Sequence, residues 1–230
     1  MSKDIAANIA EIRRRIANAA ARYGRDPYAI KLMAVTKTVA VERIKEAVDA
    51  GITLFGENYV QEAREKITAL GKNVQWHMIG RLQTNKAKYV VLLFDCVQSV
   101  DRIELALELD KRARLAGYNL NVLIEVNVSG EQTKSGIAAP DTPELIKKIA
   151  ALENISVRGL MTMAPYSDNA EDSRPYFRAL KNLGRQISEA MIPGIQMDEL
   201  SMGMTDDFEV AIEEGATIVR IGRAIFGERK

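Results

Sequence analysis

Short apolar runs alternate with helical patterns about eight times along the 230 residues of this chain, with short connections between them. The apolar runs, which we interpret as buried strands, span residues 31–38, 52–55, 74–79, 96–100, 121–128, 157–163, 197–202 and 216–221. Helical patterns span residues 41–50, 59–70, 86–94, 102–116, 143–152, 170–190 and 208–214, with Asp101 as the expected cap of the fourth. A further helix is expected at residues 2–23, where isoleucines repeat at helical spacing.

This alternation predicts an α/β fold, a TIM (β/α)8 barrel with an extra N-terminal helix. The length is close to the roughly 250 residues that such barrels usually have. A doubly wound open sheet is the alternative, but no Gly-x-Gly-x-x-Gly turn follows the first strand. Because no linker, low-complexity run or repeat interrupts the chain, we expect one domain over residues 1–230.

Composition excludes several classes of protein. The 32 basic and 31 acidic residues give a net charge of +1, which argues against binding to nucleic acid or a membrane surface through charge. Cys96 and His77 are the only residues of their types, so an intrachain disulfide, a cysteine metal cage, a Ser-His-Asp triad and a His-rich zinc site are all disfavoured. No signal core or membrane-spanning apolar run is present, and we expect a cytoplasmic protein.

Lys37 stands at the end of the first apolar run. A lysine at a strand end commonly extends to water. A desolvated lysine instead loses proton affinity and becomes the nucleophilic amine that a Schiff base requires. In a parallel barrel the working residues lie at the carboxyl ends of the strands. Those ends carry Lys37, Asn58, His77, Arg81, Ser99, Glu125, Asn127, Met163, Ser201 and Arg220.

A phosphate site is expected in the loops after the last two strands, where barrels often bind phosphate. Ser201 and Thr205 offer hydroxyl groups, and Gly203 between them allows a close backbone approach. Gly222 and Arg223 follow the last strand and offer a second such loop.

Helix capping is the competing interpretation of the first loop. Thr205 can cap the helix at residues 208–214, with Asp206 and Asp207 favouring its positive end. Both carboxylates would repel a phosphate, so they must point away if the site is to work.

Arg220 interrupts the last apolar strand, and a buried arginine needs acceptors. It can bridge side chains inside the barrel, or donate to the ring nitrogen of a pyridoxal group. A ring nitrogen that faces arginine stays unprotonated, which makes the ring a weaker electron sink.

These features together resemble the pyridoxal phosphate homeostasis proteins, barrels of the PLP-binding type similar to the N-terminal domain of bacterial alanine racemase. The matching motifs run almost end to end, at residues 34–38, 55–62, 76–86, 99–101, 126–128, 134–136, 158–163, 200–207 and 219–227. The resemblance implies a Schiff base between pyridoxal 5'-phosphate and Lys37. It implies cofactor contacts from Asn58, Ser201, Gly203, Thr205, Arg220, Gly222 and Arg223, and assigns no role to Lys134 or His77.

The function implied by the resemblance is binding of pyridoxal 5'-phosphate in intracellular vitamin B6 homeostasis, without an established reaction. Its partners would be the cofactor and apo-enzymes that depend on it, and a monomer is expected. A racemase or decarboxylase using the same cofactor is the first alternative. We expect it less than the homeostasis function, because the chain ends shortly after the last barrel strand. A Schiff-base aldolase or sugar-phosphate isomerase without cofactor is the second alternative.

Overall fold

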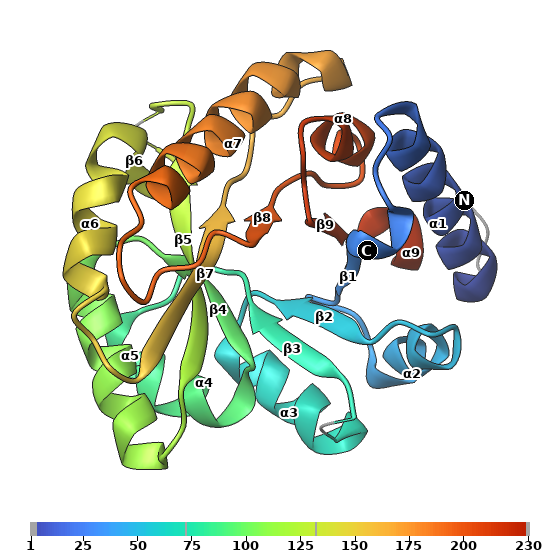
Figure 1. The fold of residues 1–230 in the computed structure, drawn as a ribbon. Helices are drawn as coiled ribbons and strands as arrows, with labels where there is room; N and C mark the ends of the chain where they lie inside the picture. The colour runs from blue at the N-terminus through green and yellow to red at the C-terminus, as the bar shows by residue number, and fades with distance from the viewer. Residues whose placement is uncertain (1–3, 72, 132, 229–230) are drawn as a thin grey trace.

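A closed barrel of parallel strands forms the centre of the computed structural model, which describes residues 4–71, 73–131 and 133–228 (Figure 1). Its strands are β1 (Lys31–Val35), β2 (Leu54–Glu57), β3 (Gln75–Met78), β4 (Cys96–Val100), β5 (Leu120–Asn127), β7 (Ile155–Met161), β8 (Glu199–Ser201) and β9 (Ile218–Ile221). They are ordered β4-β3-β2-β1-β9-β8-β7-β5, and pairing of β4 with β5 closes the ring. A two-residue strand, β6 (Ile137–Ala138), pairs with the end of β5. The closure confirms the predicted TIM barrel over the open sheet.

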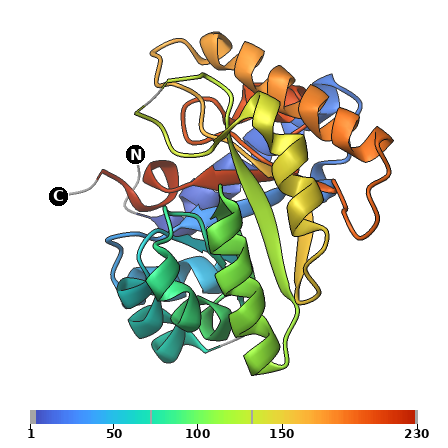
Figure 2. The same cartoon turned by 90° about the vertical axis from the view of Figure 1, so that its left-hand side faces the viewer.

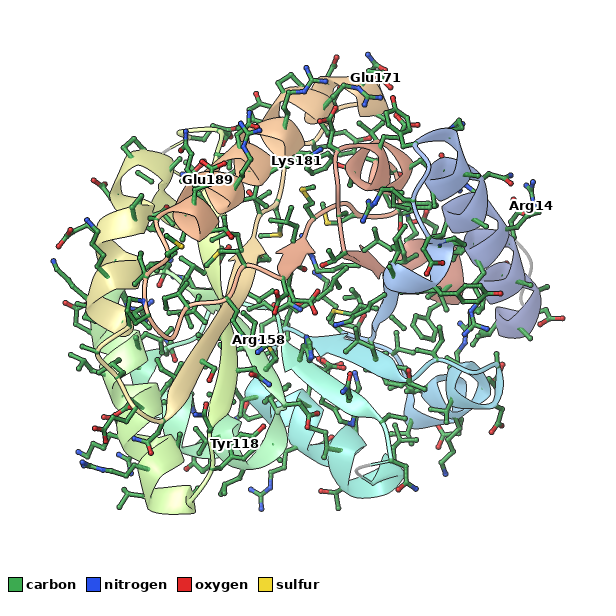
Figure 3. All side chains as sticks on the ribbon, viewed as in Figure 1. Arg14, Tyr118, Arg158, Glu171, Lys181 and Glu189 are labelled. Atoms are coloured by element: carbon green, nitrogen blue, oxygen red, sulfur yellow. The ribbon has the colours of Figure 1, made fainter. Side chains whose placement is uncertain are left out.

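Helices surround the barrel (Figure 1). They are α1 (Ile5–Arg22), α2 (Val41–Asp49), α3 (Val60–Leu70), α4 (Ala87–Leu93), α5 (Ile103–Ala116), α6 (Thr142–Ile149), α7 (Arg174–Glu189), α8 (Phe208–Glu213) and α9 (Arg223–Phe226). Figure 2 shows α5 and α6 covering the long strand β5. The long helices α1, α5 and α7 bury their apolar residues and expose charged ones. Lys181 and Glu189, labelled on α7 in Figure 3, are two such exposed charged residues.

The predicted N-terminal helix is present as α1. Asp4 caps it by accepting a hydrogen bond from the Ala7 N–H, and the predicted isoleucines are buried. The helix packs against α2, α8 and α9, so the two ends of the described chain lie on the same side of the molecule (Figure 1). An ion pair at 2.9 Å between Arg15 and Glu209 adds to the contact with α8.

Several element boundaries differ from the sequence prediction. The second strand lies at Leu54–Glu57, two residues later than expected. Helix α5 begins at Ile103 with Arg102 as its N-cap, because the Asp101 carboxylate accepts a hydrogen bond from the Arg102 guanidinium at 2.5 Å instead of capping. The short elements β6 and α9 were not expected. The first two positions of the expected 2–23 helix lie outside the described residues.

Candidate functional site

A cavity of about 460 Å³ opens at the carboxyl ends of the barrel strands. It is lined by Val35, Lys37, Asn58, Ile79, Gly80, Arg81, Glu125, Ser135, Met163, Tyr166, Met204, Thr205, Asp206, Arg220, Gly222, Arg223 and Glu228. Six of the eight residues expected at a cofactor site are in this lining. The other two, Ser201 and Gly203, are buried and outside the lining.

Lys37 enters the cavity from the end of β1, between the ends of β2 and β9. The register pairs Val35 with Gly56 on one side and Ala34 with Ile221 on the other. The Lys37 side chain is half-buried, while Thr36 before it is fully buried. Thr38 after it has a φ of 63°, an unusual value for a β-branched residue. Lys37 therefore lines the cavity between a buried strand residue and a residue of unusual backbone conformation.

Asn58 lies beside Lys37 at the end of β2. Its side-chain oxygen Oδ1 is buried and has no hydrogen-bond partner among the described residues. Gly80 lies against its backbone, where an added Cβ would come within 2.4 Å of the Asn58 carbonyl oxygen. An unpartnered buried acceptor is costly in free energy, so Asn58 offers an acceptor for a donor on a ligand.

Arg220 crosses the barrel interior and is only 4% exposed. Its Nη1 donates to the Ser201 hydroxyl at 2.8 Å, and its Nη2 donates to the Thr162 carbonyl at 2.8 Å. Burial lowers the pKa of Arg220 to about 10, which leaves the guanidinium charged at neutral pH. The arginine is thus both a bridge inside the barrel and a lining residue of the cavity, so the two interpretations drawn from the sequence are compatible.

A hydrogen-bonded chain continues from Arg220 to His77. The Ser201 hydroxyl donates to Gln98 Oε1 at 2.6 Å, and Gln98 Nε2 lies 2.8 Å from His77 Nδ1. Because Gln98 Oε1 accepts from Ser201, its amide nitrogen is the donor to Nδ1, which leaves the imidazole proton on Nε2. Burial lowers the pKa of His77 to about 3, so the ring is neutral. His77 belongs to the support of Arg220 and does not line the cavity.

Glu125 on β5 is a buried carboxyl group in the cavity wall, 3% exposed. Burial raises its pKa to about 7, helped by Asp101 and opposed by the cations of Arg220 and Arg81. The sequence places Glu125 at a strand end but gives it no role. Its position near the guanidinium groups of Arg220 and Arg81 cannot be predicted from the sequence, because it depends on how the strands are arranged in the closed barrel.

The expected phosphate loops meet at one corner of the cavity. Thr205, Gly222 and Arg223 are in the lining there. The first N–H groups of α9 have no acceptor within that helix, as at any helix start. Arg223 Nη2 donates to both carboxylate oxygens of Asp206, at 2.6 and 2.5 Å. Hydroxyl, guanidinium and backbone donors therefore converge at this corner.

The two aspartates of the first loop behave differently. Asp207 points away from the cavity, because its carboxylate accepts from the Met204 N–H at 2.7 Å and from the Ser173 hydroxyl at 3.0 Å. Asp206 lines the cavity, where Arg223 balances its charge. The condition drawn from the sequence, that both must point away, holds for Asp207 alone.

Gly203 serves the packing of the loop against α8. Its φ is +89°, and an added Cβ would lie 2.5 Å from the Ala211 Cβ and 2.9 Å from the Phe208 Cα. Lys134 also lies outside the lining, 3.6 Å from a Glu131 carboxylate oxygen.

Other kinds of site find no support in the part of the chain that the structure describes. There, no three His, Cys, Asp or Glu side chains form a group that could hold a metal ion. None of the helices in those ranges is both long and apolar enough to cross a membrane.

Comparison with known proteins shows the family to which the chain belongs. Residues 4–230 match the family model for the alanine racemase N-terminal domain. The chain is 47% identical to the pyridoxal phosphate homeostasis protein of Aquifex aeolicus, over 96% of this chain and 97% of the relative. It is 42% identical to the protein of that name from Escherichia coli K12, over 98% of this chain and 97% of the relative.

Solved structures are similar over nearly the whole chain. PipY of Synechococcus elongatus with PLP bound has a TM-score of 0.84 at 32% identity, covering 97% of this chain and 100% of PipY. An alanine racemase of Clostridium difficile has a TM-score of 0.74 at 16% identity, covering 98% of this chain and 57% of the racemase. The likeness to the racemase concerns the fold alone.

Proposed function

Because the chain belongs to the pyridoxal phosphate homeostasis proteins, within the alanine racemase N-terminal domain family, we propose that it binds pyridoxal 5'-phosphate and acts in the intracellular supply of this cofactor. The observation that carries the proposal is the convergence of Lys37, Asn58 and Arg220 in one cavity at the strand ends.

The side chains of the cavity fit the groups of this cofactor. Lys37 supplies an amine for the aldehyde, and the unpartnered Asn58 oxygen supplies an acceptor for the ring hydroxyl. Arg220 stays charged and already donates to two protein acceptors, with further N–H donors left for the ring nitrogen. When bound, the cofactor would supply an aldehyde for imine chemistry and a conjugated electron sink, which a neighbouring arginine weakens.

We assign the phosphate to the corner formed by Thr205, Gly222 and Arg223. The Thr205 hydroxyl and the N–H groups at the start of α9 provide donors, and charge-assisted hydrogen bonds to phosphate are strong. Arg223 offsets the Asp206 carboxylate at the same corner. In this assignment Ser201 and Gly203 act indirectly, Ser201 by holding Arg220 and Gly203 by shaping the loop.

The protein is proposed to hold and release the cofactor as a monomeric, single-domain cytoplasmic protein without a reaction of its own. Apo-enzymes that require pyridoxal phosphate are its proposed recipients. Light scattering of the purified protein tests the monomer. A shift in mass on mixing with a recipient apo-enzyme tests direct contact, and activation of that enzyme without any complex would favour release into solution.

The test of cofactor binding is a titration of the purified protein with pyridoxal 5'-phosphate, followed by visible absorbance. A Schiff base to Lys37 predicts a saturable visible band in the wild type and in Lys134→Ala, the matched lysine control, and none in Lys37→Ala. An unchanged band in Lys37→Ala would exclude Lys37 as the attachment site. A wild type without any band would favour the aldolase or isomerase alternative.

A further inference from the structure

A buried cluster of charged side chains contacts the chain on both sides of Lys37. Glu57 ends β2, while Glu62 and Lys66 lie one turn apart on α3. Glu57 is 0% and Lys66 4% exposed, which is rare for ionisable side chains and occurs mainly where they are paired. None of the three lines the cavity. The burial of Glu57 and Lys66 therefore needs an explanation other than direct contact with a ligand.

Lys66 is fully engaged in hydrogen bonds. Its Nζ donates to the Thr36 carbonyl at 2.5 Å, to Glu57 Oε1 at 2.7 Å and to Glu62 Oε1 at 2.6 Å. Three acceptors match the three N–H donors of an ammonium group. Lys66 is thus held as a donor to the residue before Lys37, and its nitrogen is not available as a nucleophile.

The residues on either side of Lys37 are anchored to the same cluster. The Thr36 hydroxyl donates to Glu57 Oε1 at 2.5 Å, in addition to the bond that its carbonyl accepts from Lys66. The Thr38 N–H donates to Glu62 Oε1 at 2.5 Å. Thr38 has a φ of 63°, and such a strained backbone persists only where its surroundings hold it. Glu62 supplies that constraint.

We propose that Glu57, Glu62 and Lys66 are positioning residues that fix the backbone of Lys37 so that its amine meets the aldehyde of the cofactor. The inference rests on the proposed binding of pyridoxal phosphate. In the step concerned, the Lys37 nitrogen forms a double bond to the aldehyde carbon, and the aldehyde oxygen leaves as water with both amine protons. The cluster takes no part in that exchange. It sets the position from which Lys37 starts.

A purely structural role, attaching α3 to the barrel, would also explain the burial. The two roles differ in what they affect. If the cluster is only structural, its loss should lower the stability of the protein and weaken the binding of every ligand to the same extent. If the cluster positions Lys37, its loss should slow the covalent step and leave the binding of a ligand without an aldehyde unchanged. Pyridoxine 5'-phosphate, in which an alcohol replaces the aldehyde, is such a ligand.

The test compares Lys66→Met and Glu62→Ala with the wild type and with Glu214→Gln. Glu214 is a buried carboxylate that accepts from Arg174 and Arg178 outside the cavity, so its loss controls for removal of a buried ion pair. Stopped-flow absorbance measures the rate of covalent attachment of pyridoxal 5'-phosphate below the unfolding temperature of every variant. Calorimetry measures the binding of pyridoxine 5'-phosphate.

We expect attachment to be about 10- to 100-fold slower in Lys66→Met and Glu62→Ala, the loss that small misplacements of a reacting group cause. Binding of pyridoxine 5'-phosphate should stay within about twofold of the wild type, a change small in free energy. Glu214→Gln should match the wild type in both. If Lys66→Met does not fold, Glu62→Ala decides the question alone, since Glu62 is the more exposed partner.

Wild-type attachment rates in both variants, or equal losses for both ligands, would overturn the positioning role. Failure of the wild type itself to attach pyridoxal 5'-phosphate is a different outcome, because it would overturn the proposed function and this inference with it.

Discussion

The hydroxyl groups of Ser201, at the end of β8, and of Thr205, in the loop that follows, have different surroundings, and single substitutions separate their roles. Thr205 lines the cavity, so Thr205→Ala should weaken pyridoxal 5'-phosphate binding about tenfold while leaving unphosphorylated pyridoxal nearly unchanged. Ser201 instead holds Arg220, so Ser201→Ala should weaken both ligands alike. It should also lower the free energy of unfolding by about 1–3 kcal/mol, since a buried guanidinium N–H loses its acceptor. Calorimetry with both ligands measures this. If Ser201→Ala weakens the binding of pyridoxal 5'-phosphate alone, Ser201 contacts the phosphate directly.

Glu125 predicts a dependence of stability on pH. Burial raises its pKa from 4.5 to about 7, so the folded state binds the proton more tightly than the unfolded chain. Its stabilising contribution is complete below pH 4.5 and is lost as the pH rises through about 7. Glu125→Gln should therefore equal the wild type near pH 4 and exceed it near pH 8, by at most about 3 kcal/mol.

Denaturant unfolding of the unliganded proteins across this pH range measures the effect.

Glu214 provides the opposite case, because hydrogen bonds from Arg178 and Arg174 lower the pKa of its carboxyl group. Stability from Glu214 should be lost as the pH falls, so Glu214→Gln should be most destabilised near neutral pH. A constant difference between Glu125→Gln and the wild type would contradict a buried Glu125 that titrates near neutrality.

At the residue scale, the sequence indicates the cavity well and its support poorly. Lys37, Asn58 and Arg220 are polar residues at strand ends, a pattern visible in the sequence. The hydrogen bonds that Ser201 makes were not visible in the sequence, because Gln98, one of its partners, is 103 residues away in the chain. The spacing of Glu62 and Lys66 is typical of a solvated ion pair on a helix, and only the fold reveals that Lys66 is buried.

Helix α1 is the element whose contribution the sequence predicts most directly. Ile9 is 1% exposed and packs in the core between α1 and the barrel helices. Ile9→Ala should lower the free energy of unfolding by about 2–5 kcal/mol, the range for removing buried methyl groups from a core. Arg14→Ala on the outer face should change it by less than about 0.5 kcal/mol. Thermal or chemical unfolding measures both, and a small loss in Ile9→Ala would mean that α1 is not part of the cooperative fold.

Elements differ in how clearly the sequence announces them. Long periodic helices such as α1, α5 and α7 were found because the apolar repeat extends over several turns. The elements β6 and α9 have two and four residues, too few to show a period. Asp101 is not the cap of α5, and its carboxylate accepts a hydrogen bond from the neighbouring Arg102 guanidinium. Side-chain competition of this kind is decided in the folded state.

For the whole molecule, the account predicts no amino-acid racemisation at an enzymatic rate. Racemisation needs a proton-accepting group on each face of the substrate α-carbon, and Lys37 can serve one face. Tyr166 also lines the cavity, but its hydroxyl donates to Asp168 at 2.7 Å, and this hydrogen bond raises its pKa. Tyr166 therefore retains its proton near neutral pH. When the protein loaded with cofactor is incubated with L-alanine in deuterated water, we expect no catalytic exchange of the α-proton and no formation of D-alanine. Turnover that disappears in Lys37→Ala would favour the racemase alternative.

The closed barrel itself was predictable, because repeated strand–helix units with short connections leave few arrangements that bury every strand. The contacts that join distant parts of the ring were not. The pairing of β4 with β5 and the ion pair of Arg15 with Glu209 depend on the final geometry. The pairing of β4 with β5 closes the ring, and the closed ring brings the strand ends together around the cavity.

Attachment of the cofactor to Lys37 is the feature on which the proposed function depends most. The most direct measurement is borohydride reduction of the wild-type protein loaded with pyridoxal 5'-phosphate, followed by digestion and mass spectrometry of the peptides. We expect one phosphopyridoxyl group per chain, on the peptide that contains Lys37, with Lys66 unmodified because its three N–H donors are engaged. A phosphopyridoxyl group on Lys66, Lys134 or another lysine, with Lys37 unmodified, would contradict it.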